Sequence, residues 1–421
     1  MSRIHYIDAM RGVMMALGIV LHSANVFCVN DTWEVHAPTT HWVFDVLSKC
    51  IHLFRMPVFF ITAGFFAQMT LSRKSMHNFL MHRSRRLIIP FITTALTLNV
   101  IQLELQAHYQ YSALSEHPNF ATDLSWYASG QWMEHLWFLN ILFQMCLIAT
   151  SITIVMEKIP HVFSQHIWST KQITKILMFG ALSYVLVVAL NGKLPYRLQN
   201  PLAMGMINIP VLMFYLPFFG FGMWLHRSEL ALESFGRLQL ASAGVGLLLV
   251  VMMLIPESSS HIANMCVRVF RSGLTCWWMC HLCFCSFRLL TNAPSRYFRY
   301  FSDASYTIFL FHHLFIVVFA IVLIPISISI FAKFVIMSVA SLSLSLLIYE
   351  YGIRRNSLLS FLYNGNDYPV VQPVAQTAGN APISFLRVEC NKMQNDEIIT
   401  SAKDSKSVSS ETQSAMASHS L

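Results

Sequence analysis

The chain has 421 residues, of which 55% are hydrophobic and only 11% are charged, whereas soluble domains carry about 25% charged residues. A water-soluble fold of this length cannot bury so much apolar surface, and nucleic-acid binders and disulfide-stapled secreted domains are excluded with it. The formal net charge is +8, which in a membrane protein is typical of basic cytoplasmic loops.

Ten apolar stretches are long enough to cross a bilayer, because a membrane helix needs about 20 mainly apolar residues. We therefore predict an all-α integral membrane protein with about ten transmembrane helices. The first stretch contains polar residues and has no small-residue cleavage site, so it is not interpreted as a cleaved signal peptide. The stretches run roughly over 10–29, 42–71, 87–106, 132–156, 173–192, 204–225, 238–255, 263–290, 305–324 and 330–352.

The basic residues of the loops predict the orientation of the chain. With the N-terminus inside, the outer loops clearly hold only Lys193 and Arg197, and by the positive-inside rule both termini are cytoplasmic. Residues 1–363 then form the membrane domain, and 364–421, rich in Ser, Thr, Asn and Gln, form a disordered cytoplasmic tail. The inner segments hold Arg3, Arg73, Lys74, Arg83, Arg85, Arg86, Lys158, Lys171, Lys175, Arg227, Arg237, Arg288, Arg296, Arg299, Arg354 and Arg355.

Polar residues form a stripe along the first span. Ionisable groups inside a membrane are costly and face the protein interior. Asp8 and Arg11 are three positions apart and can pair on one helix face. Arg11 and His22 are separated by only about 20° around the helix and by about 16 Å along it. A structural ion pair with a hydrogen-bonded core histidine is the alternative, but the shared stripe favours a functional site.

The second and fourth spans place further polar residues near their outer ends. His52 and Arg55 share one face of the second span, where an arginine needs an anionic partner or a water-filled cavity unless it snorkels to the surface. His135, beside Glu134, begins the fourth span at the level of His52. Trp137 alone would be typical of an interfacial aromatic belt.

The ninth span carries His312 and His313 near the membrane midplane. Adjacent helical residues point about 100° apart, so we expect at most one of them to face the cavity, with His312 on the stripe of Ser305. Glu350, near the inner end of the last span, could pair with Arg354.

The cysteines do not indicate a metal centre. Cys276, Cys280 and Cys283 share one face of one helix, which cannot surround a tetrahedral zinc ion, so we interpret them as packing residues and predict no metal site. Cys28 and Cys50 lie near the outer ends of their spans, where a disulfide would be compatible with a periplasm.

Six motifs in order along about residues 4 to 363 resemble acyltransferase family 3 of integral membrane proteins. Within that family the chain is most similar to the branch of periplasmic glucan succinyltransferases. The motifs are IDAMRG with Arg11-x10-His22, IHLFRMPVFFITAGFF, HLWFLNILF, FYLPFFGFG, ASYTIFLFHHLFI and the final Tyr349-Glu350.

The resemblance implies a multi-pass protein of the bacterial inner membrane that moves an acyl group onto hydroxyls of osmoregulated periplasmic glucans. The co-substrate would be cytoplasmic succinyl-CoA or another acyl-CoA, with no permanently bound cofactor. The partners would be the lipid bilayer, the donor, the glucan and other glucan-biosynthesis proteins, with no nucleic acid. The alternatives are a saccharide transporter or flippase, and an O-acetyltransferase acting on another cell-surface polysaccharide.

Ester formation requires a sugar hydroxyl to lose its proton beside a thioester carbonyl. A histidine is suited to this at neutral pH, and His22 is the first choice, either for direct transfer or as a transiently acylated residue. Arg11 and Asp8 would fix the inner end of the helix or steer the donor. Arg55, His135 and His312, in that order, are candidates for stabilising the oxyanion, and Arg55 could instead bind a succinyl carboxylate.

Substrate binding is predicted on both sides of the membrane. Arg83, Arg85 and Arg86 form the strongest inner basic cluster and would bind the phosphates of coenzyme A, although the positive-inside rule alone would also explain them. His52 and Trp137 would contact substrate near the outer side.

Overall fold

The computed structural model describes residues 4–30, 33–111, 124–157, 173–254 and 261–365. Within these ranges the regular structure is helical, apart from one isolated β-bridge between Leu202 and Ile207. This confirms the all-α prediction. The predicted tail lies outside the described residues from position 366 onward.

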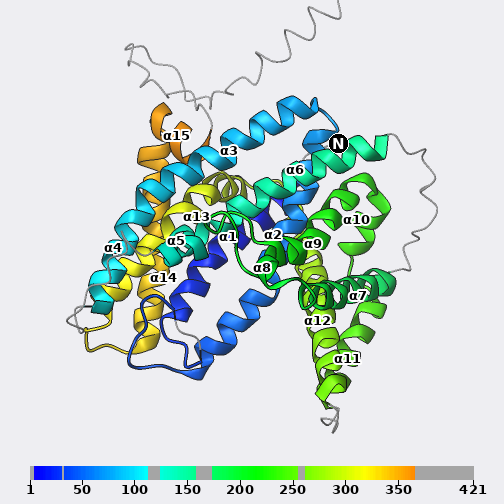
Figure 1. Ribbon diagram of the computed structural model, residues 1–421, viewed down its shortest axis with the longest axis horizontal. Coiled ribbons are helices and arrows are strands. Elements are labelled where there is room, and N and C mark those ends of the chain that lie inside the picture. The colour runs from blue at the N-terminus through cyan, green and yellow to red at the C-terminus, as the bar shows by residue number, and fades with distance from the viewer. Residues whose placement is uncertain (1–3, 31–32, 112–123, 158–172, 255–260, 366–421) are drawn as a thin grey trace, which may run out of the picture. The chain divides into compact units, whose positions relative to one another are not determined.

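The helices follow one another along the chain, and Figure 1 shows their arrangement. Their bounds are α1 His5–Asn25, α2 Trp42–Leu71, α3 Met76–Leu96, α4 Leu98–Tyr111, α5 Leu124–Ser129, the 3₁₀ helix η1 Gln131–Leu136, α6 Trp137–Glu157, α7 Ile173–Asn191, α8 Tyr196–Gln199, α9 Ile209–Arg227, α10 Glu229–Phe235, α11 Leu240–Leu254, α12 His261–Thr291, α13 Arg296–Leu323, α14 Ile330–Leu347, the π-helical turn η3 Ile348–Ile353 and α15 Ser357–Asn364.

Helices occupy all ten predicted spans. Among the described residues, eight segments are long and apolar enough to cross a membrane: His5–Asn25, Trp42–Leu71, Met76–Tyr109, Tyr127–Thr153, Ile173–Asn191, Ile209–Arg227, Arg296–Leu323 and Ile330–Ile353. The other two predicted spans correspond to α11, with 15 residues, and α12, with 31. The protein is a multi-pass membrane protein, and the exact number of spans stays a prediction.

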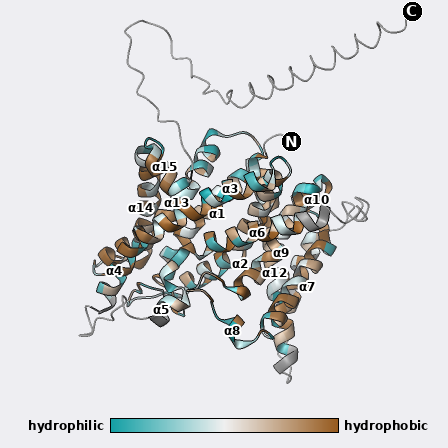
Figure 2. Cartoon of the chain, turned by 45° about the horizontal axis from the view of Figure 1, so that its top comes forward, coloured by the Kyte–Doolittle hydropathy of each residue, from teal (hydrophilic) through white to brown (hydrophobic). Residues whose placement is uncertain are grey.

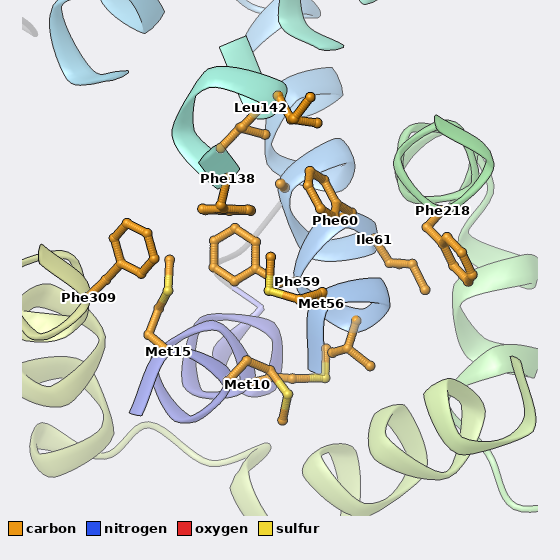
Figure 3. Close-up of a cluster of buried hydrophobic side chains, with 14 of the residues drawn as sticks. Met10, Met15, Met56, Phe59, Phe60, Ile61, Phe138, Leu142, Phe218 and Phe309 are labelled. Atoms are coloured by element: carbon orange, nitrogen blue, oxygen red, sulfur yellow. The ribbon is translucent and has the colours of Figure 1, made fainter. Parts of the chain in front are cut away.

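Figure 2 colours the chain by hydropathy and shows extended apolar stretches in the long helices. Many large apolar side chains are exposed on the outside, as expected for a surface that faces lipid. On α7, for example, Phe179, Leu182 and Leu186 are more than half exposed. The interior is apolar as well. Figure 3 shows Met15 of α1, Phe59 of α2, Phe138 of α6 and Phe309 of α13 pointing toward one another. This cluster packs together α1, α2 and α13, which carry histidine and arginine candidates, with α6, which directly follows His135.

The third span begins earlier than the sequence predicted. The helix was expected over 87–106, but α3 begins at Met76, where the Ser75 hydroxyl accepts a hydrogen bond from the Asn78 amide at 3.4 Å. A serine at this position caps a helix regardless of how polar the first turns are. The basic cluster assigned to a loop therefore lies on the first turns of α3.

Two smaller predictions are decided by the described residues. Arg354 donates to both carboxylate oxygens of Glu350 at 3.0 Å, which confirms that pair. Cys28 is buried and Cys50 is exposed, and both are free, so the disulfide considered from the sequence is not formed.

Two glycines allow α2 and α9 to approach closely. A Cβ atom placed on Gly64 would overlap the Phe219 carbonyl oxygen, and one placed on Gly222 would overlap the carbonyl oxygen of Ile61. Small residues serve this purpose in membrane proteins, where backbone contact replaces the hydrophobic effect between helices. Gly64 and Gly222 therefore form a reciprocal backbone contact between α2 and α9.

We expect Gly222→Val to lower the thermal unfolding temperature of the protein in detergent. Two methyl groups directed at the backbone of α2 must push the helices apart, and overpacking of this kind costs about 1–3 kcal/mol. Gly220→Val is the matched control, because it places the same side chain two residues away on α9, where a Cβ meets nothing within 4 Å. Equal unfolding temperatures for the two variants would contradict the close packing inferred here.

Candidate functional site

A cavity of about 990 Å³ lies among α1, α2, η1, α6, α9 and α13. It is located toward the Asn25 end of α1, which the orientation prediction places at the outer side. Six of the residues predicted from the sequence line it: His22, His52, Arg55, His135, Trp137 and His312. The sequence placed these residues on four separate spans, and the fold brings them to one site.

Four histidine rings form the centre of the site. The His22 ring lies 5.5 Å from the His312 ring and 4.7 Å from the His313 ring, measured between centroids. The His135 ring stacks on His313 at 4.8 Å and meets His312 edge-on at 5.5 Å. Three elements, α1, η1 and α13, therefore contribute imidazoles to one small volume.

The hydrogen bonds of His312 fix its tautomer. Its Nδ1 lies 3.1 Å from the Ile308 carbonyl oxygen and 2.7 Å from that of Phe309. A carbonyl oxygen can only accept, so Nδ1 carries the hydrogen and Nε2 keeps a lone pair. That Nε2 is buried and has no hydrogen-bond partner among the described residues.

The other two histidines predicted to be catalytic, His22 and His135, also present unpartnered nitrogen atoms. Nδ1 of His22 and both ring nitrogens of His135 are buried and lack a hydrogen-bond partner in the described part of the chain. A buried polar atom without a partner costs about 1–3 kcal/mol. Several such atoms around one cavity are typical of a site that binds a polar ligand.

Arg55 faces the site from α2 and does not snorkel to the surface. Its Nε donates to the Met14 carbonyl oxygen at 2.9 Å, and only 6% of the residue is exposed. Its guanidinium lies against Gly18 of α1, where an added Cβ would overlap Arg55 and would lie 3.2 Å from Nε2 of His312. Gly18 therefore makes room for the one arginine among the cavity-lining residues of the described chain.

Both His312 and His313 line the cavity, so the expectation that at most one would do so is wrong. That expectation assumed a narrow cavity on one side of α13. The cavity is wide enough for His22 to contact both rings, so it spans the angle of about 100° between adjacent residues.

Arg11 and Asp8 lie outside this cavity, toward the opposite end of α1. Arg11 donates to the Ser302 hydroxyl of α13 at 2.9 Å, and its guanidinium lies 5.2 Å from the Phe66 ring of α2. Arg11 thus connects α1, α2 and α13 near the His5 end of α1. This contact fits a positioning role for Arg11 better than contact with the reacting atoms.

The predicted donor-binding cluster lies near that same end. Arg83 and Arg86 are close enough to Arg11 to interact with it electrostatically. The Arg85 guanidinium lies 5.6 Å from the Phe361 ring of α15, and the Tyr306 hydroxyl of α13 donates to the Arg86 carbonyl oxygen at 2.7 Å. The start of α3 is thus fixed to α13 and α15, with its arginines gathered away from the histidine cavity.

Sequence reasoning gave no role at the site to Glu34, Glu134 or His313, which line the cavity together with Trp33. The Trp33 ring lies 5.8 Å from the His22 ring and 5.2 Å from the His313 ring. Glu34 belongs to the connection between α1 and α2, which has no helical periodicity, so no pattern pointed to it. Glu134 could have been found from its position next to His135.

Nearly the whole chain is similar to a known family and to named bacterial proteins. A family model described as an acyltransferase domain, of the type named Acyl_transf_3, matches residues 4–350. Glucans biosynthesis protein C of Salmonella heidelberg (strain SL476) is 26% identical over 386 residues, covering 88% of this chain and 96% of the relative. The protein of that name from Salmonella typhimurium (strain LT2) is 26% identical over 393 residues, covering 90% and 98%. No solved structure matches the chain.

Proposed function

Because the chain belongs to acyltransferase family 3, we propose that this membrane acyltransferase moves succinyl groups from cytoplasmic succinyl-CoA onto hydroxyls of periplasmic glucans. The observation that carries the proposal is the cavity in which His22, His312 and Arg55 converge. The relatives named for glucan biosynthesis support the choice of acceptor. An enzyme that modifies periplasmic glucans with a cytoplasmic donor would act in the bacterial inner membrane. Its partners would be the glucan-synthesising proteins that supply the acceptor.

In the proposed reaction a glucan hydroxyl attacks the thioester carbonyl carbon. His22 accepts the hydroxyl proton as the new C–O bond forms, and the tetrahedral intermediate carries a negative oxygen. Arg55 stabilises that oxygen, since it is a buried cation beside the histidines. The C–S bond then breaks, and the proton held by His22 passes to the departing thiolate of coenzyme A. A relay through acyl-His22 uses the same groups in two steps.

Donor and acceptor approach from opposite ends of α1 in this proposal. Arg83, Arg85 and Arg86 bind the coenzyme A phosphates near Arg11, which lies about 16 Å along the helix from His22. The acceptor enters beside His52, Trp33 and Trp137, whose rings offer flat surfaces for sugar. A cavity of about 990 Å³ is at the upper end of small-molecule sites. It has room for an acyl group and a sugar unit, with the rest of the glucan outside.

The test is mass spectrometry of periplasmic glucans from a bacterial host whose own glucans are neutral. Expression of this chain is expected to add the mass of one or more succinyl groups and to make the glucans anionic. The mass of acetyl groups would instead support an O-acetyltransferase, and unmodified glucans would refute the acceptor. Incubating the purified protein with labelled succinyl-CoA and glucan distinguishes a transferase from a saccharide transporter. Only a transferase leaves covalent label on the sugar.

A further inference from the structure

Three potential metal ligands meet on one wall of the cavity. Glu34 comes from the connection between α1 and α2, Glu134 from η1 and His313 from α13. One ligand atom from each lies within 4.8 Å of the other two. Two carboxylates and an imidazole are a donor set that suits divalent ions such as Zn²⁺ or Mn²⁺. The sequence did not indicate this cluster because its members are far apart in the chain.

His313 is oriented as metal-binding histidines are. Its Nδ1 lies 2.9 Å from Oε1 of the buried Gln102 on α4. An amide oxygen only accepts, so Nδ1 carries the hydrogen and Nε2 keeps its lone pair for a ligand. Metal-binding histidines almost always donate their second N–H to an oxygen in this way.

The backbone of Glu134 has an unusual conformation. Its φ of 48° and ψ of −129° lie outside the helical region, inside the short helix η1. For a residue other than glycine such a conformation costs about 1–3 kcal/mol, and residues held in this way concentrate at ligand sites.

The charges at the cluster need compensation. Two carboxylates this close repel each other, most strongly where burial lowers the dielectric constant. In the described part of the chain, Arg237 and Arg288 pair with Glu233 and Arg354 pairs with Glu350, and no ion pair involves Glu134. A divalent cation bound between Glu34 and Glu134 would offset this repulsion.

An independent observation also points to a ligand at this wall. The His135 ring stacks on the His313 ring at 4.8 Å, and the residue is only 7% exposed. Neither of its ring nitrogens has a hydrogen-bond partner among the described residues. A nitrogen donor is thus available beside the three ligands.

We propose that Glu34, Glu134 and His313 bind a divalent transition-metal ion whose remaining coordination positions face the cavity. Such an ion could bind an oxygen atom of a substrate close to His22, whose ring lies 4.7 Å from that of His313. The proposal goes beyond acyl transfer and does not rest on the identity of donor or acceptor, because metal binding is measured without either.

The experiment measures the metal content of the full-length protein in detergent. The protein is purified with a tag that contains no histidine, stripped with a chelator, incubated with Zn²⁺, freed of excess ion and analysed by elemental mass spectrometry. We expect about one Zn²⁺ per chain, with an affinity at least tenfold lower for Glu134→Gln. Glu104→Gln on the exposed face of α4 is the matched control and should bind as the unaltered protein does.

Two results would overturn the proposal. One is an unaltered protein that retains no Zn²⁺, which would mean that the two carboxylates share a proton instead. The other is a Glu134→Gln variant that binds as tightly as Glu104→Gln. If Glu134→Gln does not fold, Glu34→Gln and His313→Asn test the same site. Bound Co²⁺ gives the unaltered protein a visible absorption band, and a change of this band in His313→Asn identifies the imidazole as a ligand.

Discussion

Replacing His22 with alanine is expected to reduce acyl transfer by about 10²–10⁴-fold, the usual contribution of a general base. The His22 ring contacts the rings of both His312 and His313, and its Nδ1 is buried without a hydrogen-bond partner in the described chain. Alanine leaves no group at this position to accept the hydroxyl proton. The measurement is the acyl content of glucans from cells that make equal amounts of each protein, together with turnover by purified protein.

The control for His22→Ala is the substitution of another buried histidine. His281 on α12 is fully buried, bonds through Nδ1 to the Phe235 carbonyl oxygen at 2.8 Å, and does not line the cavity. His281→Ala should therefore change stability more than turnover per folded molecule. If His22→Ala keeps the turnover of His281→Ala, the base is a different residue. His312, whose Nε2 keeps a lone pair toward Arg55, is then the next candidate.

Helical spacing was sufficient to predict the residues that lie on long helices. The predicted apolar stretches are mostly helical, because backbone groups in lipid must be satisfied within the segment. The stretch over 87–106 is divided between α3 and α4, and the one over 132–156 begins with η1. His22 and Arg55 were then identified as costly ionisable groups inside such helices, and the cavity explains how that cost is met. The same reasoning identifies Arg11, but Arg11 lies about 16 Å from His22 along α1, too far to contact the atoms that react at His22.

The remaining part of the site depends on tertiary contacts that no local pattern encodes. Trp33 and Glu34 lie in an irregular connection, where neither a period of 3.6 nor one of 2 distinguishes inward from outward residues. Helical spacing favours only one of His312 and His313 as a cavity residue, because the width of a cavity cannot be inferred from one helix. The conformation of Glu134 depends on η1, the short helix between α5 and α6. From the sequence alone, this segment is predicted as the start of one straight helix.

Replacing Arg55 is expected to lower turnover by about 10²–10³-fold if its guanidinium stabilises the oxyanion. A comparison of two acyl-CoA donors distinguishes this role from binding of the succinyl carboxylate by Arg55. Butyryl-CoA has the same chain length as succinyl-CoA but lacks the terminal carboxylate. An oxyanion role predicts that Arg55→Ala lowers kcat equally with both donors. A carboxylate-binding role predicts a rise in KM for succinyl-CoA and little change with butyryl-CoA.

Gly18→Ala tests the same group without removing its charge. The added methyl group overlaps the guanidinium of Arg55, so the arginine must move away from His312 while the cation stays in the protein. Because a displacement of about 1 Å in a reacting group can cost 10²-fold in rate, Gly18→Ala should reproduce a large part of the Arg55→Ala defect. Arg354→Ala, at the exposed pair with Glu350, is the control and should leave turnover unchanged. Full activity in both Gly18→Ala and Arg55→Ala would mean that the negative charge of the intermediate is stabilised elsewhere, with His135 and a cation at Glu134 as the neighbouring groups able to do so.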